Sequence, residues 1–197
     1  MWRDRRRFCR CDQRVYIGHL RPFLYGDLAE CGLVVIAAGA NQKPGETRIE
    51  LLGRNRVIMS SIIEHLMAVN QSAVLLIVSN PVDVLTYMAQ KMSGLPAGQV
   101  IGSGTVLDTA RLKYLVGQPL NVDSRNVHAF IIGEHGDSEL AVWSSANISG
   151  VDLADYCRIT GKDDSFGAMQ RIYENVRDAA YSIIEGKGAT YYGIGMA

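Results

Sequence analysis

The sequence predicts an α/β fold built around a parallel β-sheet. Short, fully apolar runs alternate with segments in which apolar residues recur at helical spacing, and this order is typical of strand–helix–strand units. The first two apolar runs each end at a polar or glycine-containing turn, which marks the end of a strand. Uninterrupted apolar runs are typical of strands that are covered on both faces.

The first half of the chain shows this alternation most clearly. Apolar runs predict buried strands at 33–38 and 73–78, and 100–102 is predicted to be the end of a short strand. A helix at 47–69 follows from apolar residues at helical spacing, namely Ile49, Leu52, Met59, Ile62, Ile63 and Leu66. A second helix at 82–92 is predicted to end where Ser, Gly, Leu and Pro occupy 93–96.

The second half predicts two helices and two strands. A helix at 107–116 is expected to end at Gly117, and strands are expected at 126–132 and 139–144. A long helix at 165–185 begins at Ser165, a plausible N-cap. One face of that helix is apolar and contains Phe166, Met169, Ile172, Tyr173, Val176 and Ile183.

Composition excludes several classes of protein. The 197 residues are 48% hydrophobic and carry a formal net charge of zero, so nothing overall indicates a nucleic-acid partner or an anionic membrane. No apolar run approaches the ~18 residues that span a bilayer. Cys9 and Cys11 lack the second pair of a zinc site, and four cysteines do not make a disulfide scaffold, which favours a reducing cytosol.

The first 24 residues differ from the rest of the chain. Six arginines and two aspartates lie within residues 1–14, without the apolar segment of a secretory signal. We expect residues 1–24 to be an atypical leader, disordered or non-native.

Polar clusters follow three of the predicted strands, at 39–42, 79–81 and 133–137. In parallel sheets, ligands bind at the carboxyl ends of the strands. The sequence therefore predicts a site at these strand ends, although it contains no complete G-x-G-x-x-G motif for a dinucleotide.

His135 is the leading candidate for proton transfer, because its side chain titrates near neutral pH and glycines precede and follow it. Asp108 can orient the histidine, and Arg111, one helical turn further on, can bind an anion. The segment 40–48, ANQKPGETR, has the composition of a lid, and Arg48 lies at its end. A surface histidine and an ordinary i,i+3 ion pair remain the alternatives.

Five blocks carry a resemblance to a known family. GANQKPGETR, SNPVDVLTY, SGLPAGQVIGSGTVLDTARLKYLVG, NVDSRNVHAFIIGEHGDSE and KGATYYGIGMA together resemble the bacterial L-lactate dehydrogenases of the lactate/malate dehydrogenase family. The resemblance implies an incomplete Rossmann-type parallel sheet at 25–104, followed at 105–197 by part of the α+β catalytic domain. Both ends are expected to be truncated relative to the family.

The resemblance also implies a catalytic set. GEHGDSE supplies His135 as the proton donor and acceptor, and LDTAR supplies Asp108, which pairs with it, and Arg111, which grips the substrate carboxylate. Arg48 matches the loop arginine that polarises the ketone when the lid shuts. The implied reaction is hydride transfer between NAD(H) and the pair pyruvate and L-lactate.

The remaining implied contacts set specificity and bind the cofactor. Gln42 matches the position that reads the substrate side chain, where malate enzymes carry arginine; a neutral Gln favours pyruvate and L-lactate. Further substrate contacts are implied at Asn80 and Thr190. Contacts to NAD are implied at Gly39, Ala40, Ser79 and Asn80, and no metal is expected.

Family members assemble as homo-tetramers in the cytoplasm, and the allosteric ones bind fructose 1,6-bisphosphate through an arginine and a histidine. Lys113 and His128 occupy those two positions here, although two polar residues at a packed interface would look the same. Two other functions stay open. One is a malate or other 2-hydroxyacid dehydrogenase, and the other is an inactive fragment with an interaction or structural role.

Overall fold

The computed structural model describes residues 24–40, 48–162, 165–188, 190 and 193–196. The chain divides into two compact units, Met1–Ser103 and Gly104–Ala197, and each is described by itself. This division lies beside the predicted boundary between 104 and 105. Within the described residues, no helix combines the length and the apolar character needed to cross a membrane.

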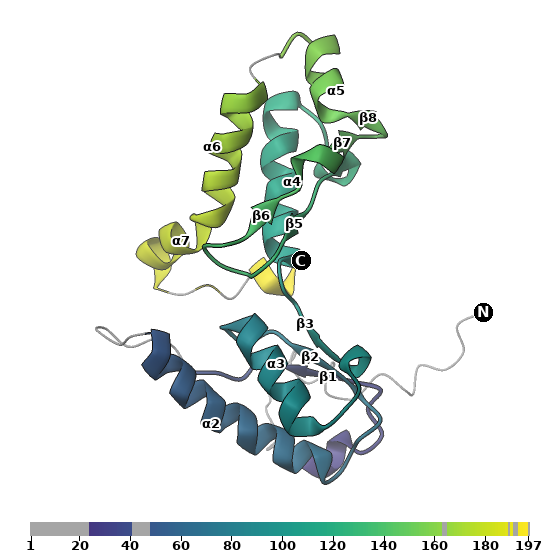
Figure 1. The fold of residues 1–197 in the computed structure, drawn as a ribbon, viewed down its shortest axis with the longest axis vertical. Coiled ribbons are helices and arrows are strands. Elements are labelled where there is room, and N and C mark those ends of the chain that lie inside the picture. Colours follow the sequence, from purple (N-terminus) through teal and green to yellow (C-terminus); the bar gives the residue numbers. More distant parts are fainter. Residues whose placement is uncertain (1–23, 41–47, 163–164, 189, 191–192, 197) are drawn as a thin grey trace, which may run out of the picture. The chain divides into compact units, whose positions relative to one another are not determined.

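The first unit is built on a parallel sheet of β1 (Leu33–Ile36), β2 (Val74–Ile77) and β3 (Val100–Gly102), in the order β1-β2-β3 (Figure 1). The register pairs Leu33 with Val74 and Leu75 with Val100. The parallel sheet predicted from the apolar runs is therefore confirmed.

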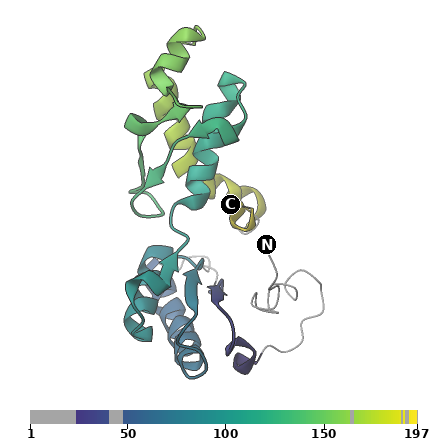
Figure 2. The ribbon, with the colours of Figure 1, turned by 90° about the vertical axis from the view of Figure 1, so that its right-hand side faces the viewer.

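Two helices, α2 (Arg48–Met67) and α3 (Val82–Ser93), pack against each other and cover one face of this sheet (Figures 1 and 2). Leu66 and Leu85 are fully buried there and pack with Leu75 and Ile77 of the central strand. The short 3-10 helices η1 (Tyr25–Leu28) and η2 (Ala97–Gln99) complete the described part of this unit.

Asn70 closes the turn between α2 and β2 with a complete set of hydrogen bonds. Its amide nitrogen donates to the carbonyl oxygens of Leu28 and Cys31 at 2.8 and 2.9 Å. Its amide oxygen accepts from the backbone N–H groups of Ser72 and Ala73. A buried side chain with all its polar atoms paired fixes the start of the strand.

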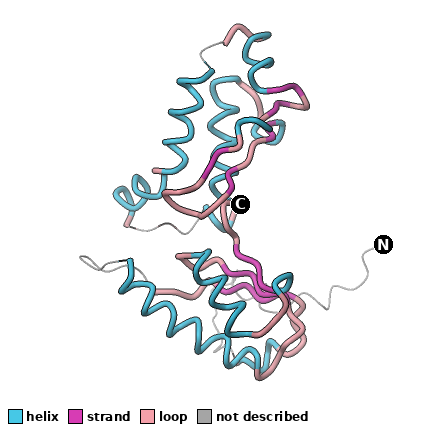
Figure 3. The backbone as a smooth tube through the Cα atoms, in the orientation of Figure 1, coloured by secondary structure: helices cyan, strands magenta, loops and turns pink. Residues whose placement is uncertain are grey.

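The second unit combines helices with short antiparallel strands, which Figure 3 distinguishes by colour. Strands pair as β4-β7-β8 and as β5-β6. Its elements are α4 (Val106–Leu120), η3 (Ser124–Asn126), β4 (Val127–His128), β5 (Ile131–Ile132), β6 (Leu140–Ala141), η4 (Trp143–Ser145), β7 (Asn147–Ile148), β8 (Val151–Asp152), α5 (Leu153–Ile159), α6 (Ser165–Arg177), α7 (Ala179–Lys187) and η5 (Gly193–Gly195).

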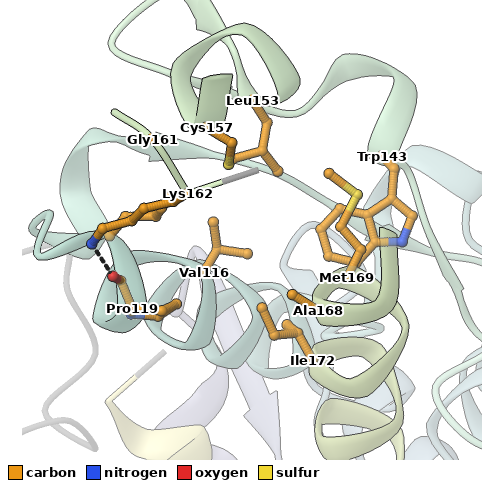
Figure 4. Close-up of a pocket in the computed structure, with 11 residues that line it drawn as sticks. Val116, Pro119, Trp143, Leu153, Cys157, Gly161, Lys162, Ala168, Met169 and Ile172 are labelled. Atoms are coloured by element: carbon orange, nitrogen blue, oxygen red, sulfur yellow. Dashed lines mark hydrogen bonds between the residues drawn. The ribbon is translucent and has the colours of Figure 1, made fainter. Parts of the chain in front are cut away.

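The core of this unit forms where α4 and α6 pack together beside the strands. Leu112, Val116, Val127, Ile131 and Val176 are each 2% exposed or less. Next to this core lies an apolar cavity of about 370 Å³, lined by α4, α5, α6 and Trp143 (Figure 4). The Lys162 ammonium at its rim donates a hydrogen bond to the carbonyl oxygen of Pro119.

The predicted end of the first helix of this unit is wrong. Gly117 does not end α4, which continues to Leu120 and is capped by Asn121 in the left-handed conformation, with φ 56°. Glycine is needed at 117 for another reason: a Cβ there would lie 2.5 Å from the carbonyl oxygen of Val122. The returning chain passes too close for any side chain.

Other predicted boundaries also need correction. The strand expected at 126–132 is split into β4 and β5, which belong to different sheets. The helix expected at 165–185 is interrupted at Asp178, so that it forms α6 and α7. Strands β7 and β8 and helix α5 were not predicted, because elements this short carry no readable periodicity.

Candidate active site

The site begins where β5 ends. The Thr105 hydroxyl donates to the carbonyl oxygen of Ile131 at 2.6 Å, and the Ile131 N–H donates to the Thr109 hydroxyl at 3.0 Å. These bonds tie β5 to the first turns of α4. Gly133, with φ 92°, then turns the chain into the loop that carries His135.

Asp108 lies in the first turn of α4 and is 3% exposed. Its Oδ2 is 2.5 Å from Nδ1 of His135, and its Oδ1 is 3.2 Å from Nη1 of Arg111. A carboxylate only accepts hydrogen bonds, so Nδ1 of the histidine carries the proton that lies between them. Nε2 of His135 is then the nitrogen that can exchange a proton with a ligand.

The i,i+3 ion pair that was the simpler alternative is present, and it coexists with the histidine contact. Asp108 uses one oxygen for Arg111 and the other for His135. The side chains of His135 and Arg111 are 23% and 19% exposed, whereas that of Asp108 is 4% exposed. The carboxylate is therefore buried beneath two groups that still reach solvent.

Glu139, just before β6, is a fourth member of this cluster that the sequence reasoning missed. It is 4% exposed, and its Oε1 has no hydrogen-bond partner among the residues that the structure describes. Burial, and next the charge of Asp108, raise the pKa of Glu139 to about 7, although His135, Arg111 and Arg177 lower it in part. A carboxylic residue at the start of an apolar strand, four residues after His135, was the available signal.

Asp108, His135 and Glu139 offer ligand atoms that all lie within 4.8 Å of one another, a grouping that also suits a metal ion. The guanidinium that bonds Asp108 places a positive charge beside these atoms, which opposes cation binding. The arrangement is better suited to holding and moving a proton.

In the first unit, the residues expected along the cofactor lie at the carboxyl ends of β1 and β2. The Ser79 hydroxyl donates to the carbonyl oxygen of Ala38 at 2.6 Å. Asn55, which the sequence reasoning also missed, accepts from the Ala40 N–H at 2.7 Å and donates to the carbonyl oxygen of Asn80 at 2.9 Å. One buried amide thus joins the two strand ends.

These strand ends fit the part of NAD that would lie along a sheet edge. Gly39 and Asn80 are exposed, while Ser79 and Asn55 hold the backbone beneath them. A Cβ at Gly39 would meet Asn55 and Ser79 at 3.6 to 3.7 Å, an ordinary contact, so the packing inside the protein does not require glycine there. The pyrophosphate of NAD would need further hydrogen-bond donors besides the predicted cofactor residues, because the sequence holds no G-x-G-x-x-G.

One strand-end prediction is corrected by the sheet topology. The cluster at 133–137 does not follow a parallel strand: it follows β5, which pairs antiparallel with β6 in the second unit. Only the clusters that begin at Gly39 and Ser79 follow strands of the parallel sheet.

For the other predicted site residues, the structure gives at most the element in which they lie and their exposure. Gln42 and residues 1–23 lie outside the described residues, and for Arg48 only its position at the start of α2 is described. Thr190 is an exposed coil residue. Lys113 is half-buried on α4, and His128 is exposed on β4.

Each unit of the chain matches a domain of a known protein family. Residues 12–102 match the lactate/malate dehydrogenase NAD-binding domain, and residues 105–197 match the α/β C-terminal domain of the same family. The first match begins inside the segment 1–24.

Relatives and solved structures of similar sequence carry the same name. An L-lactate dehydrogenase of Thermoanaerobacter sp. (strain X514) is 53% identical over 190 residues, covering 92% of this chain and 61% of that protein. An L-lactate dehydrogenase of Bacillus caldolyticus is 55% identical over 172 residues, covering 87% of this chain and 54% of that protein.

A crystal structure of a lactate dehydrogenase from a Medee basin deep-sea metagenome library superposes with a TM-score of 0.83 at 55% identity, covering 87% of this chain and 55% of that one. The crystal structure of the minor L-lactate dehydrogenase of Enterococcus mundtii, in its ligands-bound form, superposes with a TM-score of 0.83 at 42% identity. The match covers 88% of this chain and 55% of that one. The chain thus spans between 54% and 61% of the length of these four relatives. With both domain matches in order along the chain, it belongs to the lactate/malate dehydrogenase family.

Proposed function

We propose that this chain carries the catalytic groups of an NAD-dependent L-lactate dehydrogenase, which interconverts pyruvate and L-lactate. The single observation that carries the proposal is the buried Asp108 carboxylate, bonded at once to His135 and Arg111. The names of the relatives support the choice of substrate.

His135 is the proposed acid and base. Asp108 holds Nδ1, which fixes the ring so that Nε2 faces away from the carboxylate and can give a proton to the ketone oxygen of pyruvate. In the reverse direction, the neutral imidazole takes the hydroxyl proton of lactate. The buried carboxylate favours the imidazolium that forms in this step.

Arg111 is the proposed anchor for the substrate carboxylate. Its guanidinium bonds Asp108 through Nη1, and the side chain remains partly exposed. The planar fork of a guanidinium suits a carboxylate through two parallel hydrogen bonds. We further propose that Arg48 stabilises the negative charge that develops on the substrate oxygen and that Asn80 and Thr190 contact the substrate.

NAD, when bound, supplies the hydride acceptor or donor for the substrate carbon. Gly39, Ala40, Ser79 and Asn80 are the residues proposed to lie along it. Support comes from their place at the carboxyl ends of β1 and β2, the edge at which parallel sheets bind ligands.

Gln42 is proposed to select pyruvate over oxaloacetate, because a neutral side chain offers no partner for a second carboxylate. The alternative is a malate or other 2-hydroxyacid dehydrogenase. Replacing Gln42 by arginine should shift the preference towards oxaloacetate, as judged by the ratio of kcat/KM values. An unchanged ratio would remove Gln42 from the specificity assignment.

Assembly and regulation follow the family in this proposal. We propose a homo-oligomer, a tetramer in the complete protein, that acts in the cytoplasm. Lys113 and His128 are proposed to bind fructose 1,6-bisphosphate, since each offers a cationic or hydrogen-bonding group. A pyruvate saturation curve that does not change on addition of the sugar bisphosphate would remove that site.

The direct test of the function is pyruvate-dependent oxidation of NADH by the purified chain. Replacing His135 by alanine should lower kcat/KM by at least about 100-fold, because general acid–base catalysis contributes that much or more. Fluorescence titration with NADH reports cofactor binding separately. Binding without turnover, in a folded chain, would favour the inactive-fragment alternative, and turnover that survives the His135 substitution would overturn the assigned acid and base.

A further inference from the structure

One buried ionisable group has no part in the proposed mechanism. The Glu139 side chain lies in the same cluster as Asp108 and His135, with ligand-type atoms within 4.8 Å of theirs. Its Oε1 is buried and, within the described part of the chain, has no hydrogen-bond partner. Buried side-chain oxygens are paired in most proteins, so an unpaired one beside an acid–base pair calls for an explanation.

Charged and polar groups from three segments face Glu139. Helix α4 contributes Asp108 and Arg111, and the loop after β5 contributes His135. Helix α6 contributes Arg177 and Tyr173.

The two groups from α6 are already engaged elsewhere. The Arg177 guanidinium donates to both carboxylate oxygens of Asp178, at 2.8 and 3.0 Å. The Tyr173 hydroxyl donates to the backbone carbonyl oxygen of Glu139 at 2.5 Å, so it holds the backbone and leaves the carboxyl group alone. The carboxyl therefore interacts with Asp108, Arg111 and His135 mainly through its charge.

Given the function proposed above, we propose that Glu139 is a positioning residue that sets the proton affinity of His135 through its own state of ionisation. With Glu139 neutral, His135 faces the Asp108 carboxylate, which Arg111 partly balances. With Glu139 ionised, a second negative charge lies beside the ring and favours the imidazolium. The two groups then titrate as a coupled pair.

This coupling has a direct consequence for the reaction. Reduction of pyruvate needs the imidazolium, which gives the proton from Nε2 to the substrate oxygen, whereas oxidation of lactate needs the neutral ring. Ionised Glu139 keeps the imidazolium to higher pH and so extends the range of the reduction. Glu139 exchanges its own proton with solvent, and the transferred proton does not pass through it.

The deciding experiment is an NMR titration of the whole chain with labelled histidine. The His135 signal is identified by its absence in His135→Asn. Glu139→Gln keeps the shape of the side chain and removes the charge, and it should lower the pKa of His135 by about one unit, because an opposite charge within ~4–6 Å shifts a pKa by one unit or more. Glu139→Asp keeps the charge and should retain most of the wild-type value. Equal His135 pKa values in the wild type and in Glu139→Gln would overturn the proposal.

Two further readouts keep the result decisive. In the wild type, the labelled Glu139 carboxyl carbon should titrate near neutral pH; titration below pH ~5, the ordinary range of a glutamate, would overturn the proposal even if neither variant folds. The NMR shift needs no turnover. If Glu139→Gln lowers the pKa of His135 but the wild-type chain shows no turnover, the proposed function is wrong and the inference about Glu139 stands. If the chain turns over but the pKa of His135 is the same in both proteins, the proposed function stands and the inference is wrong.

Discussion

The two units both end strands in buried polar clusters, and the clusters differ in how completely their hydrogen bonds are satisfied. In the first unit, Asn55 and Asn70 use both the oxygen and the nitrogen of their amides to bond backbone groups. In the second unit, Asp108 is paired twice, but Glu139 next to it has an oxygen that bonds none of the described residues. The amides of the first unit hold the backbone in place, whereas the carboxyl group of Glu139 can change its charge.

The reason lies in what each group can do. A paired amide does not titrate, and its bonds hold the strand ends in one conformation. An unpaired carboxyl that is buried beside a carboxylate and an imidazole has two protonation states of similar energy near neutral pH. We therefore expect substitutions in the first cluster to change stability and substitutions in the second to change activity or pH dependence.

The largest expected effect is that of Asp108→Asn on activity. An asparagine keeps the shape of the side chain, but it can donate to Nδ1 and so favours the wrong histidine tautomer, which should lower kcat/KM by about 1,000-fold. The matched control is Asp123→Asn, which removes an exposed carboxylate paired with Arg125. Activity within threefold of the wild type for Asp108→Asn would break the contrast between the two clusters.

Asn70→Ala should have its effect on stability alone. The carbonyl oxygens of Leu28 and Cys31 and the N–H of Ala73 would lose their partner, at a cost of about 3 kcal/mol. Hydrogen exchange of the β1 and β2 amides measures this as a protection loss of about 100-fold. Gln71→Ala is the control, because Gln71 is exposed and its side chain donates to the carbonyl oxygen of Met67, the last residue of α2. Unchanged protection would show that the Asn70 network does not stabilise the sheet.

The sequence predicted the first unit better than the second, and the elements show why. Strands β1 and β2 lie in uninterrupted apolar runs, and helices α2 and α3 have apolar residues at helical spacing. Strands β4 to β8 have two residues each, so their pairing is decided by contacts between distant segments. The splitting of 126–132 comes from such contacts, because β4 pairs with β7 and β5 pairs with β6.

For the site, the residue types were readable but their hydrogen bonds were not. Asp108, Arg111 and His135 were singled out from local spacing and resemblance, and the structure places them in contact. Asn55 and Asn70 were missed, since nothing in the local sequence tells a buried polar residue from an exposed one. Glu139 was missed although it stands at the start of a predicted strand, four residues after His135.

A smaller effect is expected for the pH dependence of stability. Glu139 has an ordinary pKa of 4.5 when unfolded and about 7 when folded, so the folded chain binds the proton more tightly. Stability from this group is fully present below pH ~4.5 and is lost as pH rises through ~7, by about 2 kcal/mol after structural relaxation. Glu139→Gln should flatten this part of the curve from urea unfolding, while Glu134→Gln, at an exposed position, should not. If the free energy of unfolding of the wild type instead rose with pH over this range, and rose more than that of Glu139→Gln, the predicted direction of the effect would be wrong.

The smallest expected effect concerns the packing of the second unit, which contains an unfilled cavity. The cavity beside α6 has apolar walls, and Ala168 faces it (Figure 4). Leucine at this position would bury three more carbon atoms in existing space, which should stabilise the packing of α6 by about 1 kcal/mol at most, because part of the gain is lost to rotamer strain. Urea unfolding compares this variant with Ala154→Leu, a substitution at an exposed position on α5 that should have little effect. Destabilisation by Ala168→Leu would mean that the surrounding side chains already close the cavity in solution.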